Sequence, residues 1–155
     1  MKKIGVYAGS FNPFHVGHAD ILRQALDVFD EVIIAPGRNP MKDGEEKDEN
    51  GFPTSNPIFE NVKVIPFVGL LSKFLDHVAF SEDGQGEVFL IRGLRNGEDL
   101  QYEQNQLQFI KEMYPSLKTV FFICDKKFEH ISSSALRALK KVSETEYKKY
   151  TYGHS

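Results

Sequence analysis

The chain has 155 residues, of which 41% are hydrophobic and 26% charged, and these values are ordinary for one globular domain with a hydrophobic core. The net charge of -3 argues against a general nucleic-acid binder, because such proteins usually carry a basic surface. The single cysteine, Cys124, excludes an internal disulfide, and no apolar run has the length of a membrane span. We therefore expect residues 1–155 to form a single cytoplasmic domain that binds neither nucleic acid nor membranes.

The first third of the sequence has a strand–helix–strand pattern. Residues 3–8 are predicted to form a buried strand, and residues 31–35 a second one. Between them, residues 17–28 place apolar side chains such as Ile21 and Leu22 at the spacing of a helix with one buried face. Such a βαβ unit implies a parallel sheet with a right-handed crossover.

Residues 37–60 break this pattern. Acidic residues crowd together between Asp43 and Glu49, and glycine, asparagine and proline continue through Pro57. No helical or strand period is present there, so we predict a flexible loop at 43–57, directly after Lys42.

The rest of the sequence again alternates strands with helices. The predicted elements are strands at 62–67, 87–91 and 119–123, helices at 70–80, 99–114 and 132–141, a turn at 81–86, and a short last helix that begins with the capping box of Ser143 and Glu146. The predicted fold class is therefore α/β, with a Rossmann-like, open, mainly parallel five-stranded sheet and helices on both faces.

Open parallel sheets bind ligands at the carboxyl ends of their strands. The loops that follow the first, second, fourth and fifth predicted strands start at this edge. They contain Ser10–His18, Lys42, Arg92–Arg95 and Phe128–Ser134, and each of these segments carries residues suited to phosphate.

The segment His15-Val16-Gly17-His18 opens the first predicted helix. Backbone N–H groups and imidazoles around a helix N-terminus form a natural phosphate site, and Gly17 allows close approach of the backbone. The histidine pair is also compatible with a metal site, although no Cys, Asp or Glu completes a ligand set before Asp20. Taken alone, the motif is equally consistent with a structural role and with a functional role. The preceding segment Gly9–Pro13 makes the functional role the favoured one.

Two further segments carry candidate anion-binding groups. Arg92 and Arg95 follow a buried strand, where guanidinium groups are costly unless an anion or water receives them. The serines of Ile131–Ser134 open a helix and either cap it or offer extra hydroxyls to an anion. Glu103 is expected on a helix beside Arg95. Neither the G-x-G-x-x-G fingerprint nor a P-loop is present.

Together these segments resemble the nucleotidyltransferase superfamily that carries H-x-G-H near its N-terminus and I-S-S-[ST] near its C-terminus. More closely, the chain resembles the phosphopantetheine adenylyltransferase family. The segments that carry this resemblance are Tyr7–Pro13, His18, Lys42, Ile91–Arg95, Asp99–Glu103 and Ile131–Ser134. The most specific part is R-G-L-R followed by D-x-x-Y-E.

The resemblance implies transfer of AMP from ATP to 4′-phosphopantetheine by in-line attack, giving dephospho-coenzyme A and pyrophosphate in coenzyme A biosynthesis. It implies catalytic roles for His18, Lys42 and Arg92. It implies that the acceptor is bound by Ser10, Lys42, Leu71 and Arg92. The ATP-binding residues that it implies are Gly9, Ser10, Phe11, His15, His18, Gly93, Leu94, Arg95, Glu103, Phe128, Ile131, Ser132, Ser133 and Ser134. It also implies Mg²⁺ held mainly by the ATP phosphates, with no side-chain ligands, and a homo-oligomer, typically a hexamer.

Some positions depart from that family. His15 stands where threonine is common, and Phe128 stands where tryptophan is usual. One alternative is an adenylyl- or cytidylyltransferase for another phosphate acceptor, such as nicotinamide mononucleotide or a polyol phosphate. A second alternative is a nucleotide-binding regulatory protein without turnover. The joint presence of His18, Lys42 and Arg92 opposes it, because binding alone needs no group for a transition state.

Overall fold

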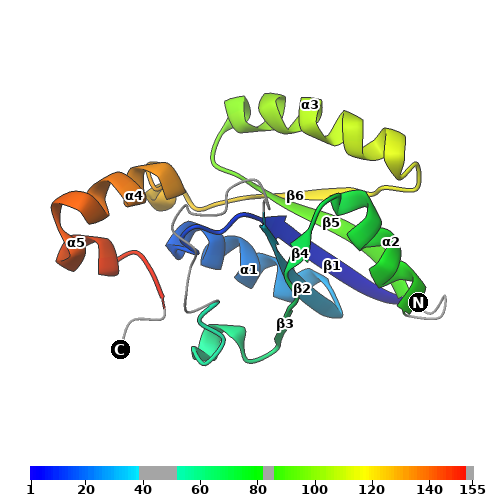
Figure 1. Cartoon of the computed structure of the whole chain (residues 1–155), viewed down its shortest axis with the longest axis horizontal. Coiled ribbons are helices and arrows are strands. Elements are labelled where there is room, and N and C mark those ends of the chain that lie inside the picture. The colour runs from blue at the N-terminus through cyan, green and yellow to red at the C-terminus, as the bar shows by residue number, and fades with distance from the viewer. Residues whose placement is uncertain (39–51, 82–85, 153–155) are drawn as a thin grey trace.

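The computed structural model describes residues 1–38, 52–81 and 86–152, and in it strands alternate with helices along the chain (Figure 1). In chain order the elements are β1 (Lys2–Gly9), α1 (Val16–Val28), β2 (Glu31–Arg38), the 3-10 helix η2 (Pro57–Phe59), β3 (Val62–Val64), β4 (Phe67–Val68), α2 (Leu71–Ser81), β5 (Gly86–Leu94), α3 (Gly97–Met113), β6 (Thr119–Ile123), the 3-10 helix η3 (Lys126–Phe128), α4 (Ser133–Val142) and α5 (Glu144–Lys148).

The strands form one sheet in the order β3-β2-β1-β5-β6, and the short β4 also pairs with β2. Every pair is parallel, which confirms the predicted α/β class with its mainly parallel sheet. The central β1 pairs on both sides, so that Val6 lies beside Ile33 of β2 and Leu90 of β5. Residues 4–8 are buried because helices cover both faces of the sheet.

Several element boundaries differ from the sequence-based prediction. The predicted strand at 62–67 is two short strands, β3 and β4. Ser81 belongs to α2, and residues 82–85 of the predicted turn lie outside the described residues. Most important for the site, β5 continues through Leu94, which pairs with Ile123 of β6. Arg92 and Gly93 are therefore strand residues and do not belong to a loop.

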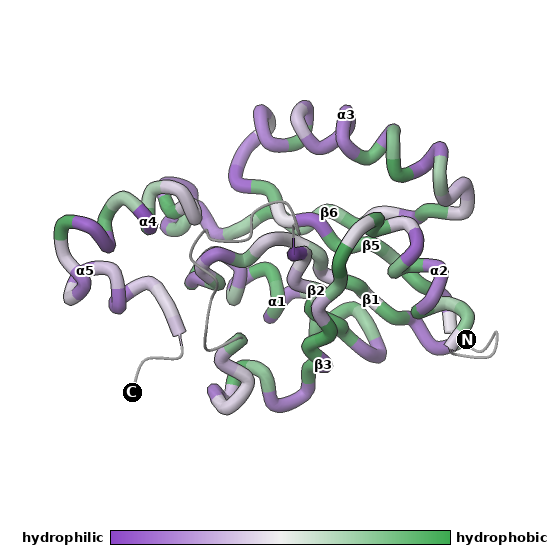
Figure 2. The backbone as a smooth tube through the Cα atoms, viewed as in Figure 1, coloured by the Kyte–Doolittle hydropathy of each residue, from purple (hydrophilic) through white to green (hydrophobic). Residues whose placement is uncertain are grey.

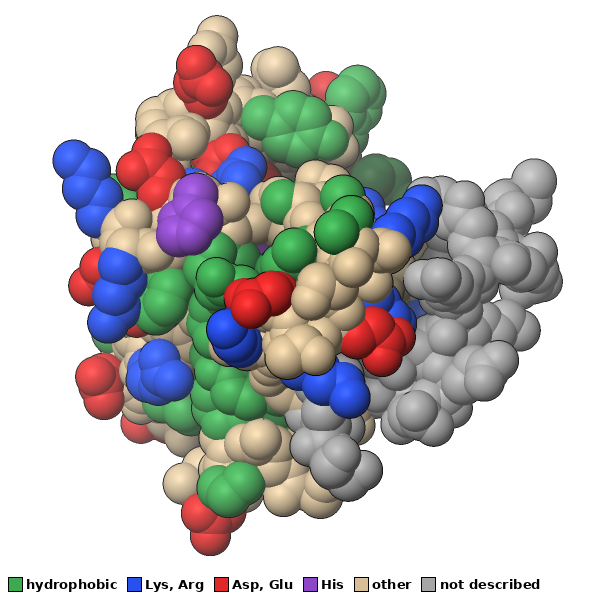
Figure 3. All heavy atoms as spheres, turned by 90° about the vertical axis from the view of Figure 1, so that its left-hand side faces the viewer, with side chains coloured by type: hydrophobic (Ala, Val, Ile, Leu, Met, Phe, Trp, Pro, Cys, Tyr) green, Lys and Arg blue, Asp and Glu red, His purple; other side chains and the backbone are tan. Residues whose placement is uncertain are grey.

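The helix surfaces that face solvent are mainly polar, with some exposed apolar side chains such as Phe80, Phe109 and Val142. Figure 2 shows green, apolar strands in the centre of the molecule and alternating purple and green along the helices, as expected for helices with one buried face. Figure 3 views the end of the molecule where α4 and α5 lie, and there Lys and Arg side chains alternate with Asp and Glu. No helix among the described residues has the length and apolar character needed to cross a membrane.

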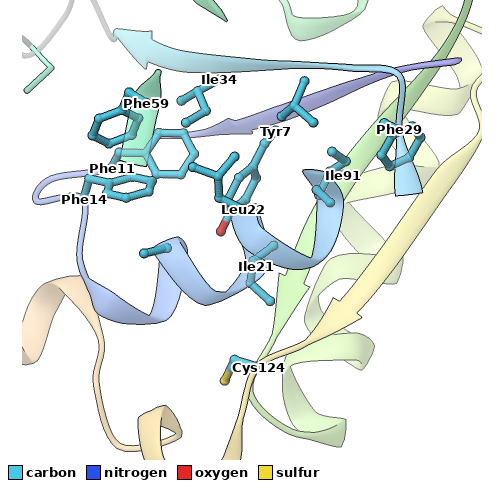
Figure 4. Close-up of a cluster of buried hydrophobic side chains, with 13 residues drawn as sticks. Tyr7, Phe11, Phe14, Ile21, Leu22, Phe29, Ile34, Phe59, Ile91 and Cys124 are labelled. Atoms are coloured by element: carbon cyan, nitrogen blue, oxygen red, sulfur yellow. The ribbon is translucent and has the colours of Figure 1, made fainter. Parts of the chain in front are cut away.

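Each face of the sheet has its own apolar core. On one face, Leu22 and Ile21 of α1 pack against Tyr7 and Ile91, together with a group of phenylalanines (Figure 4). On the other face, Leu75 of α2 belongs to a buried cluster, against which the partly buried side chains Leu107, Ile110 and Tyr114 pack. The alternation of side chains along β1 divides them between the two faces, so that α1 is fixed on the face that carries Tyr7.

The region around the predicted loop at 43–57 is described only from Phe52 onward, so Lys42 and residues 43–51 lie outside the described residues. The ring of Phe52 lies 5.1 Å from that of Phe14 and 5.0 Å from that of Phe59, measured between ring centroids. The last part of the predicted loop therefore has defined contacts with the core beside α1.

Candidate active site

A cleft of about 240 Å³ opens where the carboxyl ends of β1, β5 and β6 meet the N-termini of α1 and α4. Three of the four segments predicted to converge at this edge line it, and the fourth holds Lys42, outside the described residues. The lining residues are Tyr7, His15, Gly17, His18, Ile21, Gly93, Leu94, Arg95, Asp99, Cys124, Phe128, Ile131, Ser132 and Ser133.

His15 and His18 cap the start of α1 by reciprocal hydrogen bonds. The N–H of Gly17 donates to Nδ1 of His15 at 3.0 Å, and the N–H of His15 donates to Nδ1 of His18 at 3.1 Å. Since each Nδ1 accepts a hydrogen bond, the proton of each neutral ring resides on Nε2. The two side chains thus supply two Nε2–H donors at a helix N-terminus, where phosphate oxygens are favoured.

The surroundings keep both imidazoles neutral. His15 is 5% exposed, and burial, reinforced by the positive charge of Arg95, lowers its pKa to about 4. Burial and then the neighbouring His15 hold the pKa of His18 well below its usual value. The rings of Phe11 and Phe14 lie 5.0 and 5.3 Å from the His18 ring and cover part of it. Near pH 7 the pair therefore acts as hydrogen-bond donors and not as cations.

This arrangement favours a phosphate ligand over a metal ion at the histidines. Both Nδ1 atoms already accept backbone hydrogen bonds, and no group of three His, Cys, Asp or Glu side chains suited to a metal occurs among the described residues. The carboxylate of Asp99, which lines the cleft, is engaged by Arg95.

Arg95 is fixed at the rim of the cleft by the first turn of α3. Its Nε and Nη2 donate to the two carboxylate oxygens of Asp99 at 3.1 and 3.2 Å, and its backbone N–H donates to Oδ2 at 2.8 Å. The hydrogen bond to Asp99 raises the pKa of Arg95, which remains a cation. Asn96 caps α3 by accepting from the N–H of Asp99 at 3.1 Å, which holds the carboxylate in place.

Arg92 points to the opposite face of β5 from Gly93, toward α3. Its Nη1 donates to the carbonyl of Ala8 at 2.8 Å, and its Nε lies 3.3 Å from Oε2 of Glu103. The helix that carries Glu103 does pack beside Arg95, as predicted, but Asp99, one helical turn earlier, pairs with Arg95, and Glu103 pairs with Arg92. Neither Arg92 nor Glu103 lines the cleft, although Gly93, next to Arg92 in β5, does.

The three serines at the start of α4 have different hydrogen-bond partners. Ser132 accepts from the N–H of Ala135 at 3.1 Å, which is ordinary helix capping. Ser133 donates to the carbonyl of Pro13 at 3.3 Å and so ties α4 to the loop before α1. Ser134 is exposed, and its hydroxyl lies 3.3 Å from that of Ser132. Ser132 and Ser133 line the cleft, whereas Ser134 does not.

The remaining predicted residues lie around the cleft. Phe11 has a φ of 47°, its side chain is buried in the core, and it does not line the cleft. Gly9 contacts the Phe11 ring, Ser10 is exposed, and Leu71 begins α2 beside the second core cluster. Four further residues line the cleft although no sequence pattern assigned them to the site, namely Tyr7, Ile21, Asp99 and Cys124. For three of them the sequence offers a signal in their position next to the motifs: Tyr7 lies near the end of β1, Cys124 directly follows β6, and Asp99 ends R-G-L-R-x-x-x-D. Ile21 reads as an ordinary apolar position of α1.

The chain matches a known family and named relatives over most of its length. A family model described as cytidylyltransferase-like matches residues 6–139. The chain is 40% identical over 144 residues to the phosphopantetheine adenylyltransferase of Cytophaga hutchinsonii, with 91% of both chains covered. It is 37% identical over 138 residues to the phosphopantetheine adenylyltransferase of Syntrophomonas wolfei, covering 87% of this chain and 81% of the relative.

Solved structures share the fold at lower identity. The nicotinic acid mononucleotide adenylyltransferase of Plasmodium falciparum, complexed with APC, superposes with a TM-score of 0.66 at 16% identity, covering 98% of this chain and 91% of that one. A bifunctional NMN adenylyltransferase/ADP ribose pyrophosphatase of Francisella tularensis, complexed with AMP and a manganese ion, has a TM-score of 0.57 at 17% identity, covering 90% and 41%. These likenesses establish the same Rossmann-like fold.

Proposed function

This chain belongs to the cytidylyltransferase-like family and is a nucleotidyltransferase, and we propose that it moves AMP from ATP to the phosphate of 4′-phosphopantetheine. The products are dephospho-coenzyme A and pyrophosphate, so the enzyme serves coenzyme A biosynthesis. The observation that carries the proposal is the pair of neutral histidines at the N-terminus of α1, which line the same cleft as Ile131 and Ser133 and keep Nε2–H free to donate.

In this proposal ATP occupies the described cleft. Its phosphates lie at the N-terminus of α1, where His15 and His18 donate hydrogen bonds to them. The rest of the nucleotide lies along the end of β5 and the start of α4. The residues proposed to hold it there are Gly93, Leu94, Arg95, Phe128, Ile131, Ser132 and Ser133.

The attacking group of phosphopantetheine is a phosphate oxygen that already carries negative charge. No general base is therefore needed, and catalysis consists of positioning and charge stabilisation. As the oxygen bonds to the α-phosphorus, the bond from that phosphorus to the pyrophosphate oxygen breaks and the electron pair leaves with pyrophosphate. His18 donates to the α-phosphoryl oxygens in this transition state, while Lys42, Arg92, Ser10 and Leu71 hold the acceptor.

A divalent cation accompanies the nucleotide in this proposal, and we take it to be Mg²⁺. The carboxylate of Asp99 in the cleft is paired with Arg95, and that of Glu103 with Arg92. Among the described residues the cleft therefore offers phosphate-binding donors and no free carboxylate. An ion held by the triphosphate oxygens fits this donor set, and it supplies charge neutralisation of the leaving pyrophosphate.

The alternative acceptor is a mononucleotide, because the structural neighbour from Plasmodium falciparum is a nicotinic acid mononucleotide adenylyltransferase. The test is pyrophosphate release by the purified protein with ATP, Mg²⁺ and one of several acceptors. We expect release with phosphopantetheine, and little with nicotinate mononucleotide, nicotinamide mononucleotide or a polyol phosphate. Release with another acceptor alone would overturn the assigned substrate, and silence with all acceptors despite ATP binding would overturn the catalytic function.

We also propose that the protein is a cytoplasmic homo-oligomer, a hexamer by resemblance to its family. The apolar outer face of α3 supports self-association. Tyr102, Phe109 and Met113 recur at helical spacing and are 66%, 68% and 50% exposed. Leu107 and Ile110 lie on the inner face of the same helix and pack against the core of the sheet. A second copy of the chain fits this surface because Tyr102 and Phe109 are otherwise left in water, whereas Met113 is half-exposed and its sulfur also contacts Oγ of Ser72.

A further inference from the structure

The described C-terminal residues return to the catalytic histidines. The N–H of Val16 donates to the carbonyl of Tyr150 at 3.0 Å, and His15 forms an antiparallel β-bridge with Thr151. The segment Tyr150–Tyr152 thus lies along the first residues of the H-x-G-H motif, more than one hundred residues away in sequence. We refer to this segment as the C-terminal strap.

Side-chain packing supports the strap from both of its ends. The ring of Tyr152 lies 5.9 Å from that of Phe14, which in turn lies 5.3 Å from His18. On the other side, Tyr147 of α5 is buried with Ile131, and Val16 packs against the same cluster. The strap is therefore anchored by residues that pack against His18 and Ile131, both of which line the cleft.

The same C-terminal unit holds the other end of the histidine loop. Nη1 of Arg137 donates to the carbonyl of Asn12 at 2.6 Å, and Oγ of Ser133 donates to that of Pro13 at 3.3 Å. The loop Asn12–Val16 therefore accepts hydrogen bonds from α4 at its start and pairs with the backbone of the strap at its end. Figure 1 shows α4 and α5 extending from the end of the sheet beside the N-terminus of α1.

From these contacts we propose that the C-terminal strap is a positioning element for nucleotide transfer, which fixes His15, and through it His18, so that both Nε2–H groups point at the phosphates of ATP. The inference deepens the proposed function and rests on it. Its physical basis is that His15 is the cap of α1. The backbone of His15 is held by the strap on one side, and its N–H holds the His18 ring on the other.

One substitution removes the backbone tie while sparing the helix. Val16 is the first residue of α1, a position where proline is well tolerated because its N–H has no partner within the helix. His15 before it has φ −132° and ψ 179°, an extended conformation compatible with a following proline. Val16→Pro therefore deletes the hydrogen bond to Tyr150, and Val16→Ala is the matched control that trims the side chain and keeps the N–H.

We expect Val16→Pro to lower kcat about fivefold to tenfold relative to Val16→Ala, as loss of one positioning hydrogen bond implies, with the KM for ATP nearly unchanged. NMR titration of the histidine rings supplies a second measurement that needs no turnover. In Val16→Pro the pKa of His15 should rise from about 4 toward its ordinary value, because a loosened loop admits water. Equal kcat and equal His15 titration in the two variants would overturn the proposal.

A pair of truncations covers the case in which the proline variant does not fold. A chain that stops after Lys149 lacks the strap, whereas one that stops after Tyr152 keeps it. We expect the shorter chain alone to lose kcat and to show the raised His15 pKa, and matching behaviour of both chains would contradict the strap's role. A full-length protein that releases no pyrophosphate with any acceptor refutes the proposed function, and the His15 titration still decides whether the strap orders the loop.

Discussion

The imidazole rings of His15 and His18 stack with their centroids 3.7 Å apart, while the N–H of His15 donates to Nδ1 of His18. Each ring therefore depends on the other for its place, and both residues line the cleft. Replacement of either histidine is expected to disturb the other, so the losses from the two single variants should not add in the double variant.

The first prediction concerns His18. His18→Ala should keep ATP binding within a few-fold but reduce kcat about a hundredfold or more, because the donor to the transition-state phosphoryl group is lost. Single-turnover pyrophosphate release and equilibrium ATP binding measure the two quantities. The denaturation midpoint of the variant serves as the control for folding, and unchanged turnover would contradict the assigned role.

The second prediction is a pH dependence of stability. His15 has a pKa of about 4 in the folded protein and an ordinary pKa of 6.5 when unfolded, so the unfolded state binds more protons between these values. The contribution of neutral His15 to the free energy of unfolding is therefore complete above pH 6.5 and is lost as the pH falls to about 4. The loss from His15 is on the order of 3 kcal/mol, from about 1.4 kcal/mol for each pH unit. His18, whose pKa is also lowered, acts in the same direction, and Arg95 adds to the effect on His15.

Urea unfolding at intervals between pH 4 and pH 7 tests this dependence. His15→Asn is the matched variant, because asparagine still caps the helix but does not titrate. We expect a shallower loss of unfolding free energy on acidification in the variant than in the parent protein. Equal slopes would show that His15 is not held neutral by the fold.

The local pattern of the sequence predicted the sheet, because β1, α1 and β2 each carry a clear apolar period. It also placed the histidines correctly at a helix N-terminus, since Gly17 and the two rings occur at the capping positions themselves. The prediction ended β5 at residue 91, three residues before its last residue in the structure. Nothing in R-G-L-R has strand character, and the strand extends to Leu94 only because β6 offers backbone partners up to Ile123.

Side-chain partners were the least predictable part of the site. Both Asp99 and Glu103 lie on one face of α3, and either is a plausible partner for an arginine before that helix. The choice depends on where each arginine lies relative to β5: Arg92 lies within the strand and pairs with Glu103, whereas Arg95 follows its last residue and pairs with Asp99. The C-terminal strap gave no signal at all, because its ties to Val16 and His15 use backbone atoms.

The third prediction uses two glycines. A Cβ on Gly93 would meet Cγ1 of Ile21 at 2.8 Å and the Tyr7 hydroxyl at 3.4 Å, so Gly93→Ala must push α1 away from β5 at the cleft. We expect a loss of about 1–3 kcal/mol in unfolding free energy, as in overpacked cores, and weaker ATP binding. Gly97→Ala is the control, because its Cβ would meet nothing within 4 Å. An equal response of both variants would contradict the close approach at Gly93.

The fourth prediction concerns self-association through α3. Phe109→Glu places a charge on the exposed apolar face and should shift the protein to a smaller species in sedimentation equilibrium. Glu112→Gln on the same helix is the control, since it removes a charge without adding one to that face. An unchanged mass for Phe109→Glu would exclude this face as the contact between copies.

The fifth prediction separates the two ends of the reaction. Arg92 bridges the Ala8 carbonyl and Glu103 with two different guanidinium nitrogens, which a lysine cannot do at once. If Arg92 holds the acceptor phosphate, Arg92→Lys should raise the KM for phosphopantetheine about tenfold or more and leave the KM for ATP nearly unchanged. Arg95→Lys should do the reverse, because Arg95 lines the cleft proposed for ATP and the lysine variant loses the two-point contact with Asp99.

Steady-state kinetics with each substrate varied in turn measures both constants. A rise in the KM for ATP alone in Arg92→Lys would move Arg92 to the nucleotide side and leave the acceptor phosphate without its proposed guanidinium.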